Sequence, residues 1–325
     1  MRILIATGIY PPDVGGPAQY AKNLKEEWER TGYKVKVKTF RLEHSLPTGV
    51  RHFYFFLKIL PAVLWSDFIF ALDTFSVGWP ATCAAKIFGK KIIIRTGGDF
   101  LWEGYVERSR DKVLLRDFYR ITRETWSWKE RLIFKITKWT LHHASAVIFS
   151  TKWQRDIWSL PYGLERVQVF FVENYYGLKE ESFKPKDKEF IASTRPLVWK
   201  NLDVLKEIGV KIHLENSPYK EFMDKLAHAY AVILVSLGDI SPNLVLDAIR
   251  YNKPFIITEE NGLMDRIGGI ALTVNPKDVE NIKSKILWLS DKEHYITQVE
   301  KVKNFNFTHS WGEIAREIID IWKTI

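Results

Sequence analysis

Short apolar runs alternate with helical patterns along the whole chain, and this alternation most constrains the fold. The first run, at residues 3–6, leads through a loop to a helical pattern over 17–31, with Pro17 at its start and Gly32 beyond its end. Further strands are expected at 34–39, 68–72, 91–95, 146–150 and 167–172, and then at 190–194, 210–214, 231–236, 255–258 and 270–273. Strands separated by helices form parallel sheets, so the sequence predicts an α/β protein.

The chain has 325 residues, enough for two domains with full cores. A polar, irregular stretch at 174–188 separates the two sets of strands and predicts the boundary. We therefore expect a first domain at 1–178, with a basic helical insertion near 100–143, and a short second domain at 179–307. Residues 308–325 form an amphipathic pattern that predicts a C-terminal helix.

Composition narrows the class of protein. Hydrophobic residues make up 46% and charged residues 27%, as in soluble globular proteins. One cysteine excludes a disulfide framework and a cysteine metal site within the chain, and no signal peptide pattern opens it, which favours the cytoplasm. The apolar stretch 53–72 is interrupted by Lys58, Pro61, Ser66 and Asp67, so we expect a helix and then a strand rather than a membrane span.

The formal net charge is +9, which favours a nucleic acid or an anionic membrane as a partner. The basic residues match no nucleic-acid-binding motif, so no nucleic-acid partner is expected. Residues 106–143 hold ten basic and five acidic side chains, and Arg131, Lys135 and Lys138 share one face of a helical pattern. This segment is typical either of a membrane-surface helix or of a packed helix with a solvated basic side.

Two carboxylates seven residues apart, Asp239 and Asp247, mark the most informative segment, 238–249. The strand expected at 231–236 ends just before it, and Ser241 with Pro242 is expected to open a helix. Free amides at a helix start bind anions. The segment therefore predicts a site for a sugar, its phosphates and a ribose.

In each domain, the loop that follows the first strand holds a further candidate site. Gly15 and Gly16 precede the first helix, where glycines let backbone approach a phosphate, although an ordinary turn has the same sequence. Arg195 and Lys200 bracket the first loop of the second domain and suit a diphosphate, although two surface cations without a role are equally compatible with the pattern.

The order of these motifs resembles the family-four, or group 1, glycosyltransferases of the GT-B fold. The likeness spans nearly the whole chain and rests on motifs in sequence order: Gly15-Gly16, the segment 169–174, the Arg195 and Lys200 pair, the Asp239 and Asp247 pair, Lys253-Pro254, and Phe307 to Trp311. The resemblance implies two Rossmann-like domains facing a cleft, with the C-terminal helix crossing back to the first domain.

The resemblance also implies a function: retaining, metal-independent transfer of a sugar from a nucleotide-sugar to a glycan or lipid-linked acceptor, without a cofactor. Arg195 and Lys200 would hold the diphosphate, Asp239 would act at the donor sugar, and Asp247 would bind the ribose. The remaining donor contacts would come from Gly15, Gly16, Ser241, Asn243 and Leu244. Such enzymes build cell-surface polysaccharides and glycolipids, at times as peripheral proteins of the inner membrane face.

The sequence departs from the family pattern in three places. Aspartates stand where the family has two glutamates, which shortens each side chain by one methylene. The family's histidine is missing from the segment 95–103, where Arg95 and Asp99 either face the acceptor or, for Asp99, cap a turn. The second domain is short. Two rival functions follow: a catalytically degenerate relative that binds nucleotide or glycan, and a nucleotide-sugar epimerase of the same fold.

Overall fold

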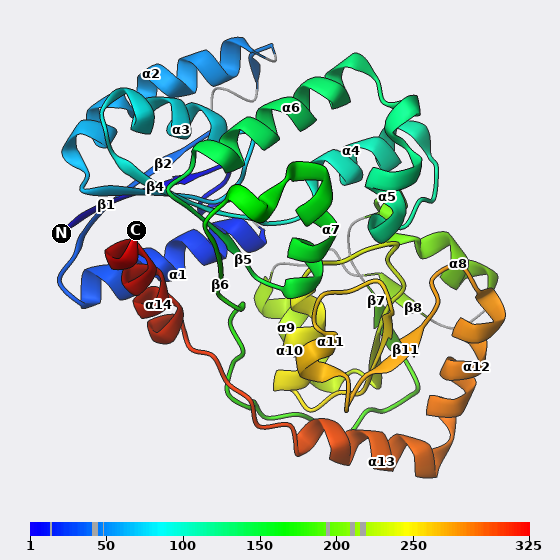
Figure 1. The fold of residues 1–325 in the computed structure, drawn as a ribbon. Helices are drawn as coiled ribbons and strands as arrows, with labels where there is room; N and C mark the ends of the chain where they lie inside the picture. Colours follow the sequence, from blue (N-terminus) through cyan, green and yellow to red (C-terminus); the bar gives the residue numbers. More distant parts are fainter. Residues whose placement is uncertain (14, 41–44, 48, 193–195, 209–211, 215–218) are drawn as a thin grey trace. The chain divides into compact units, whose positions relative to one another are not determined.

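The computed structural model describes residues 1–13, 15–40, 45–47, 49–192, 196–208, 212–214 and 219–325 (Figure 1). The chain divides into two compact units. The first unit comprises Met1–Leu101, Thr125–Tyr175 and His309–Ile325, and the second comprises Trp102–Glu124 and Tyr176–Thr308.

The first unit is built on a parallel six-stranded sheet in the order β2-β1-β3-β4-β5-β6. Its strands are β1 (Arg2–Thr7), β2 (Lys34–Thr39), β3 (Phe68–Ala71), β4 (Lys91–Arg95), β5 (Ala146–Phe149) and β6 (Val169–Phe171). The central strands are buried on both faces, as continuous Val, Ile and Phe runs predict. The strands expected from the sequence are confirmed, with ends that shift by one or two residues.

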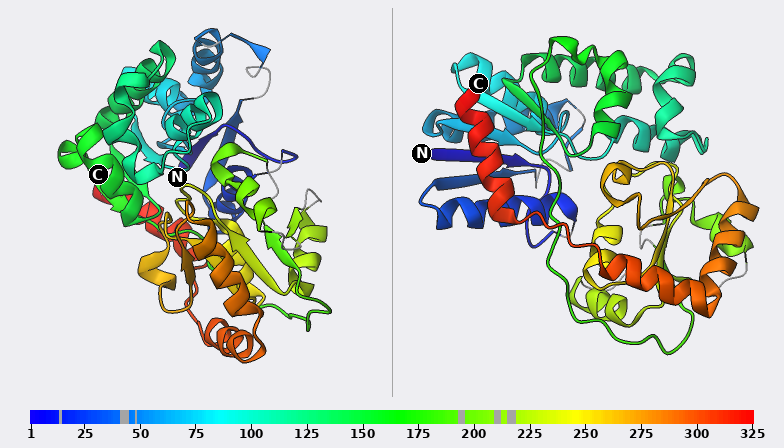
Figure 2. Two further views of the ribbon diagram at one scale, coloured as in Figure 1. Left: turned by 90° about the vertical axis from the view of Figure 1, so that its right-hand side faces the viewer. Right: turned by 60° about the horizontal axis from the view of Figure 1, so that its bottom comes forward.

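Helices cover both faces of this sheet. One face carries α1 (Gly16–Arg30) and α14 (Trp311–Thr324), which lie side by side (Figure 2). The other carries α2 (Val50–Trp65), α3 (Gly78–Ile87) and α6 (Trp128–His143), with α3 in contact with both neighbours. After β5 comes α7 (Lys152–Tyr162). The apolar stretch 53–72 thus forms a helix and a strand as predicted, and no helix in the described part of the chain could span a bilayer.

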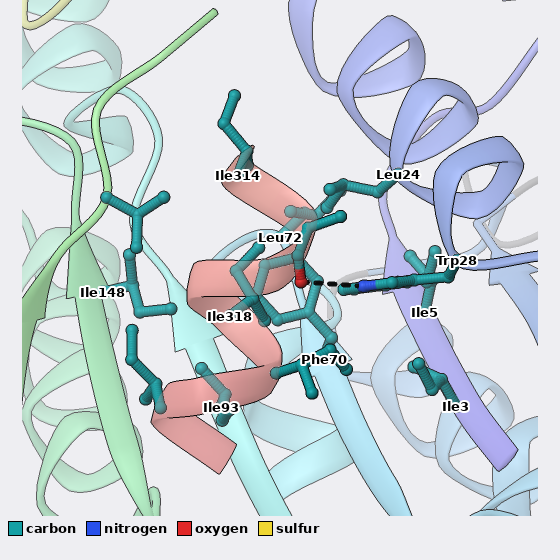
Figure 3. Close-up of a cluster of buried hydrophobic side chains, with 14 of the residues drawn as sticks. Ile3, Ile5, Leu24, Trp28, Phe70, Leu72, Ile93, Ile148, Ile314 and Ile318 are labelled. Carbon is teal, nitrogen blue, oxygen red and sulfur yellow. Dashed lines mark hydrogen bonds between the residues drawn. The ribbon is translucent and has the colours of Figure 1, made fainter. Parts of the chain in front are cut away.

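Trp28 of α1 joins the C-terminal helix to the sheet (Figure 3). Its indole is 1% exposed, packs edge-on against Phe68 and Phe70, and donates a hydrogen bond of 3.1 Å to the carbonyl of Ala315. Apolar side chains of α14 fill the same cluster, among them Ile314 and Ile318. The C-terminal helix therefore returns to the first unit, as expected.

The second unit contains a parallel five-stranded sheet in the order β11-β10-β9-β7-β8. Its strands are β7 (Phe190–Ala192), β8 (Ile212–Leu214), β9 (Ala231–Leu234), β10 (Phe255–Thr258) and β11 (Leu272–Val274). Its helices after β7 are α8 (Leu202–Glu207), α9 (Tyr219–His228), α10 (Asn243–Arg250), α11 (Met264–Ile267), α12 (Val279–Ser290) and α13 (Lys292–Lys303). Each sheet is a Rossmann-like layer, so the predicted α/β fold class is confirmed.

The segment expected as one insertion, 100–143, is divided between the units. Most of α4 (Phe100–Ser109) and all of α5 (Leu115–Ile121) group with the second unit, whereas α6 belongs to the first. Trp102 lies 5.7 Å from Trp199 between ring centroids, and the Leu115 amide donates to the Leu237 carbonyl. These contacts with residues after β7 and β9 assign 102–124 to the second unit.

Candidate functional site

Lys200 and Asp239 form an ion pair at the carboxyl edge of the second sheet. The distance from Lys200 Nζ to Asp239 Oδ2 is 2.7 Å, and the side chains are only 10% and 13% exposed. Lys200 ends a 3₁₀ turn after β7, and its ammonium lies 4.2 Å from the centroid of the Trp199 ring. Two charges so far removed from water stabilise each other, because neither could remain there alone at low cost.

Backbone pairing fixes the position of Asp239. Its amide donates to the Glu260 carbonyl at 2.9 Å, and its carbonyl accepts from the Gly262 amide at 3.2 Å. A parallel bridge joins Asp239 to Asn261 beyond the end of β10. The loops after β9 and β10 therefore hold one another, and the carboxylate is preorganised at the strand ends where parallel sheets bind ligands.

Asp247 has a different partner. Its carboxylate lies 3.3 Å from the Arg250 guanidinium, which also binds Glu180 at 2.9 Å. The two aspartates therefore bind different cations, Lys200 for Asp239 and Arg250 for Asp247. Burial raises the pKa of the Asp247 carboxyl to about 6, while Arg250 lowers it in part.

The raised pKa of Asp247 predicts a pH-dependent stability. Because the folded state holds this proton more tightly than the unfolded state, the free energy of unfolding falls as pH rises from about 4 to about 6. Asp247→Asn removes this dependence. We expect the variant to gain as much as about 3 kcal/mol relative to the parent between pH 4 and pH 7, measured by urea unfolding. Asp156→Asn, at an exposed aspartate, is the control. The prediction would be contradicted if the difference in unfolding free energy between Asp247→Asn and the parent were the same at pH 4 and at pH 7.

The start of α10 differs from the expectation. Pro242, not Ser241, occupies the N-cap position, and no side chain caps the helix, which begins at Asn243. Pro242 has an extended backbone that suits this position without a hydroxyl cap. The amides of Asn243 and Leu244 lie in the first turn, where helical amides have no partner within the helix. Their place in the first turn agrees with the sequence, and anion binding by them stays a prediction, whereas Ser241 does not cap the helix.

Residues 102–124 contact the loops that carry the ion pair. Glu107 accepts a hydrogen bond of 2.7 Å from the Val198 amide, and Lys112 donates to Asn201 and Asp203 at 2.9 Å. A Cβ atom at Gly238 would lie 2.6 Å from the Leu115 Cβ, so only glycine allows this close approach. The segment is thus packed on both sides of the Lys200–Asp239 pair.

Arg116 and Glu260 form a second ion pair at this edge. The Glu260 carboxylate is fully buried and burial raises its pKa, with Arg116 opposing the shift, while the Arg116 side chain is 46% exposed. Neither residue was predicted from the sequence. Glu260 directly follows a predicted strand, so the rule that sites lie at strand ends could have found it. No local pattern could have found Arg116, because only the packing of 102–124 brings it there.

In the first unit, Gly15 and Gly16 lie at the start of α1. Gly15 has φ 158°, and a Cβ atom there would lie 2.8 Å from the Ile9 Cδ1 atom. The helix α1 begins at Gly16, with Pro17 in its first turn and no side-chain cap. The first amides of α1 therefore follow a close turn at the carboxyl end of β1, which suits an anion.

The two acceptor-side candidates in the first unit, Arg95 and Asp99, are buried. Arg95 ends β4 and is 8% exposed; its guanidinium donates to the Asn174 side chain and stacks 4.0 Å from the Tyr20 ring centroid. Asp99 is 1% exposed and accepts a hydrogen bond of 2.7 Å from the Trp158 indole. This contact ties the segment before α4 to α7, so the geometry favours the structural alternative for Asp99.

Arg195, the second cation predicted for the diphosphate, lies outside the residues that the structure describes, so its role stays a prediction. Within the described ranges, no group of three or more His, Cys, Asp or Glu side chains is arranged to hold a metal ion.

Comparison with known proteins bears on the fold. Neither a scan of protein-family models nor a search of curated proteins gives a match. Among solved structures, the chain is similar over 99% of its length to 98% of the sucrose-phosphate synthase of Thermosynechococcus elongatus, with a TM-score of 0.71 and 12% identity. The chain has the GT-B fold.

Other solved structures match over their full lengths. Anabaena HepE in complex with UDP aligns over 100% of both chains with a TM-score of 0.66 and 13% identity. The UDP-GlcNAc 2-epimerase of Methanocaldococcus jannaschii aligns over 100% of both chains with a TM-score of 0.58 and 13% identity. These structures include a synthase and an epimerase, so the fold alone does not identify the reaction of this chain.

Proposed function

We propose that the protein is a nucleotide-sugar-dependent glycosyltransferase that acts with retention, without a metal ion, on a glycan or lipid-linked acceptor. The observation that carries the proposal is the largely buried Lys200–Asp239 pair at the carboxyl edge of the second sheet. A hexosyl group is the expected cargo, and cell-surface polysaccharide or glycolipid synthesis at the inner face of a membrane is the expected setting.

The residues at this edge suit the charges of such a reaction. Cleavage of the donor's glycosidic bond places negative charge on the leaving diphosphate, and preorganised cations stabilise that charge. Lys200 supplies one cation, and we assign Arg195 a second by resemblance. Arg116 adds a third, because its half-exposed guanidinium is held beside the Asp239 loop by Glu260.

The carboxylates take complementary roles. Asp239 pairs with Lys200 and, in the proposal, contacts the donor sugar near the reacting carbon. Asp247 accepts hydrogen bonds from the ribose hydroxyls, and the α10 amides of Asn243 and Leu244 contact sugar or phosphate. Gly15 and Gly16 approach the donor phosphates from α1. UDP in the HepE complex supports a nucleotide as the shared ligand class.

Epimerisation of a nucleotide-sugar is the second candidate. The epimerase named above shares the fold, and an epimerase needs the same nucleotide site without an acceptor. A catalytically degenerate binding protein is the third, because each aspartate is one methylene shorter than the glutamate of the family pattern. The first two candidates bind nucleotide and the third binds nucleotide or glycan, whereas only the first transfers a sugar to another molecule.

A thermal-shift screen tests the nucleotide site shared by these candidates. We expect one of UDP, GDP or ADP, or a sugar conjugate of it, to raise Tm by several degrees, because about 2.7 kcal/mol is gained at a hundred times Kd. The matching nucleoside without phosphates should shift Tm much less. Equal shifts with nucleoside and diphosphate, or no shift with any nucleotide, would contradict a diphosphate site at Lys200.

A further inference from the structure

The 3₁₀ turn that carries Lys200 is short. It comprises Val198–Lys200, and its own hydrogen bonds run from the amides of Lys200 and Asn201 back to the carbonyls of Leu197 and Val198. A turn of this length has too few internal bonds to fix its own position, so contacts from outside must determine where the Lys200 ammonium lies. Residues 102–124, the segment that groups with the second unit, contact the turn at its start, its middle and its end.

Glu107 of α4 holds the start of the turn. Its carboxylate accepts a hydrogen bond of 2.7 Å from the Val198 amide, although the two residues are 91 positions apart. The first amide of a helical turn has no partner within the turn, and the N-cap residue, Leu197, makes no side-chain hydrogen bond. Glu107 therefore does for this turn what a capping side chain does for a helix.

Lys112 holds the end of the turn. The residue that follows the turn, Asn201, has φ 56° and is 1% exposed. Its side-chain oxygen accepts a hydrogen bond of 2.9 Å from Lys112 Nζ, and its side-chain nitrogen donates to the carbonyls of Val235 and Pro276. These three bonds hold Asn201 in the left-handed conformation that sets the direction in which the chain leaves Lys200.

Trp102 packs against the middle of the turn. Its ring centroid lies 5.7 Å from that of Trp199, and the two side chains are 1% and 5% exposed. The indole of Trp102 is held in turn by a hydrogen bond of 3.0 Å to the Val113 carbonyl. Because the Lys200 ammonium lies 4.2 Å from the Trp199 ring centroid, the packing of Trp102 on Trp199 also determines the surroundings of the cation.

The same segment reaches the loop that carries Asp239. The Leu237 amide donates to the Trp199 carbonyl at 2.8 Å, and the Leu115 amide donates to the Leu237 carbonyl at 3.2 Å. The loops after β7 and β9 are thereby joined to one another and to α5. Both partners of the Lys200–Asp239 pair are therefore held against residues 102–124.

We propose that residues 102–124 position the Lys200 ammonium for the leaving diphosphate, and that Glu107, Trp102 and Lys112 are positioning residues that act through Lys200. The inference rests on the proposed function for the role of Lys200. A cation stabilises a leaving group well only when it is preorganised, and a displacement of about 1 Å costs up to about a hundredfold in rate. Loss of a positioning contact should therefore lower the rate only while Lys200 is present.

A double-mutant cycle tests this dependence. Glu107→Ala is expected to lower kcat/KM for sugar transfer about tenfold, because Lys200 loses its fixed place. Glu107→Gln should stay within about threefold of the parent, since its amide oxygen still accepts from the Val198 amide. In the Lys200→Met background, Glu107→Ala should lower kcat/KM by less than about twofold, because the group that it positions is already absent.

Asp111→Ala is the matched control, because it removes an exposed carboxylate from the same segment. It should retain parental kcat/KM. Lys112→Met is a second test at the other end of the turn, in a side chain that is 41% exposed and so tolerates substitution. It should lower kcat/KM about threefold, again only when Lys200 is present.

Binding measurements on the same variants separate positioning from folding. Glu107→Ala should weaken binding of the nucleoside diphosphate about tenfold and leave binding of the matching nucleoside unchanged, because only the diphosphate contacts Lys200 in the proposal.

Three results would overturn the inference. Equal losses of kcat/KM from Glu107→Ala in the parent and in Lys200→Met would show that Glu107 acts through general stability. Parental kcat/KM in both Glu107→Ala and Lys112→Met would show that the turn needs neither contact. Parental kcat/KM in Lys200→Met would remove the proposed role of Lys200 itself, and this inference with it.

Discussion

Lys200→Met is expected to lower kcat/KM for sugar transfer at least about a hundredfold. The substitution keeps the length of the side chain and removes the cation that lies 2.7 Å from Asp239. In the proposed reaction that cation stabilises the leaving diphosphate, and loss of one preorganised electrostatic contact in an active site costs about 100- to 1,000-fold in rate. Steady-state kinetics with the nucleotide-sugar selected by thermal shift measures the effect.

A control must separate loss of stability from loss of catalysis in Lys200→Met, because the Lys200–Asp239 pair is largely buried. Removing one partner leaves the other charge uncompensated, which costs about 3–5 kcal/mol. Lys200→Met combined with Asp239→Asn removes both charges and should restore most of the unfolding free energy without restoring transfer. Lys323→Met removes a cation that pairs with the exposed Asp320 and should retain parental kcat/KM. A double variant that is stable and as active as the parent would contradict the role of the pair.

Trp28→Ala is expected to lower the free energy of unfolding by about 3–5 kcal/mol, measured by urea denaturation. The indole is 1% exposed, packs against two Phe rings and binds the Ala315 carbonyl, so its loss leaves a cavity beneath α14. Trp28→Phe should cost less, because an aromatic ring remains. The structure also predicts faster proteolysis of the C-terminal helix in the alanine variant.

Trp128→Ala provides the matched control for stability, since that indole is 70% exposed. Its unfolding free energy should stay within about 0.5 kcal/mol of the parent. Equal losses for Trp28→Ala and Trp128→Ala would show that α14 is not held by the contacts described for Trp28.

The fold was largely predictable because the central strands of its sheets are buried on both faces. Such strands are continuous apolar runs, and β3 and β9 stand out in the sequence for this reason. Helix α14 was predictable from the spacing of its apolar residues, and its return to the first unit came from the family resemblance. The assignment of 102–124 was not predictable, since it depends on contacts such as Leu115 with Leu237 and Glu107 with Val198, more than 90 residues apart.

The site was predictable only where a local pattern marks it. Asp239 and Lys200 each follow a strand, and the structure brings them together. Their pairing depends on how the loops after β7 and β9 approach one another, which no local spacing encodes. The sequence placed Asp247 with Asp239 in one site, but its Arg250 partner on the same helix and the raised pKa follow from burial. Arg116 and Glu260 were missed because tertiary packing alone joins them.

Sugar transfer is tested by mixing the protein with the selected nucleotide-sugar and a membrane extract that contains lipid-linked acceptors. The assay measures release of nucleoside diphosphate and labelling of the acceptor. We expect the parent to release the diphosphate and to label the acceptor together, and Lys200→Met to do at least about a hundredfold less of both. Binding of nucleotide without release would identify a binding protein. Conversion of the donor to its epimer without acceptor labelling would identify an epimerase. Either result would contradict the assignment as a glycosyltransferase.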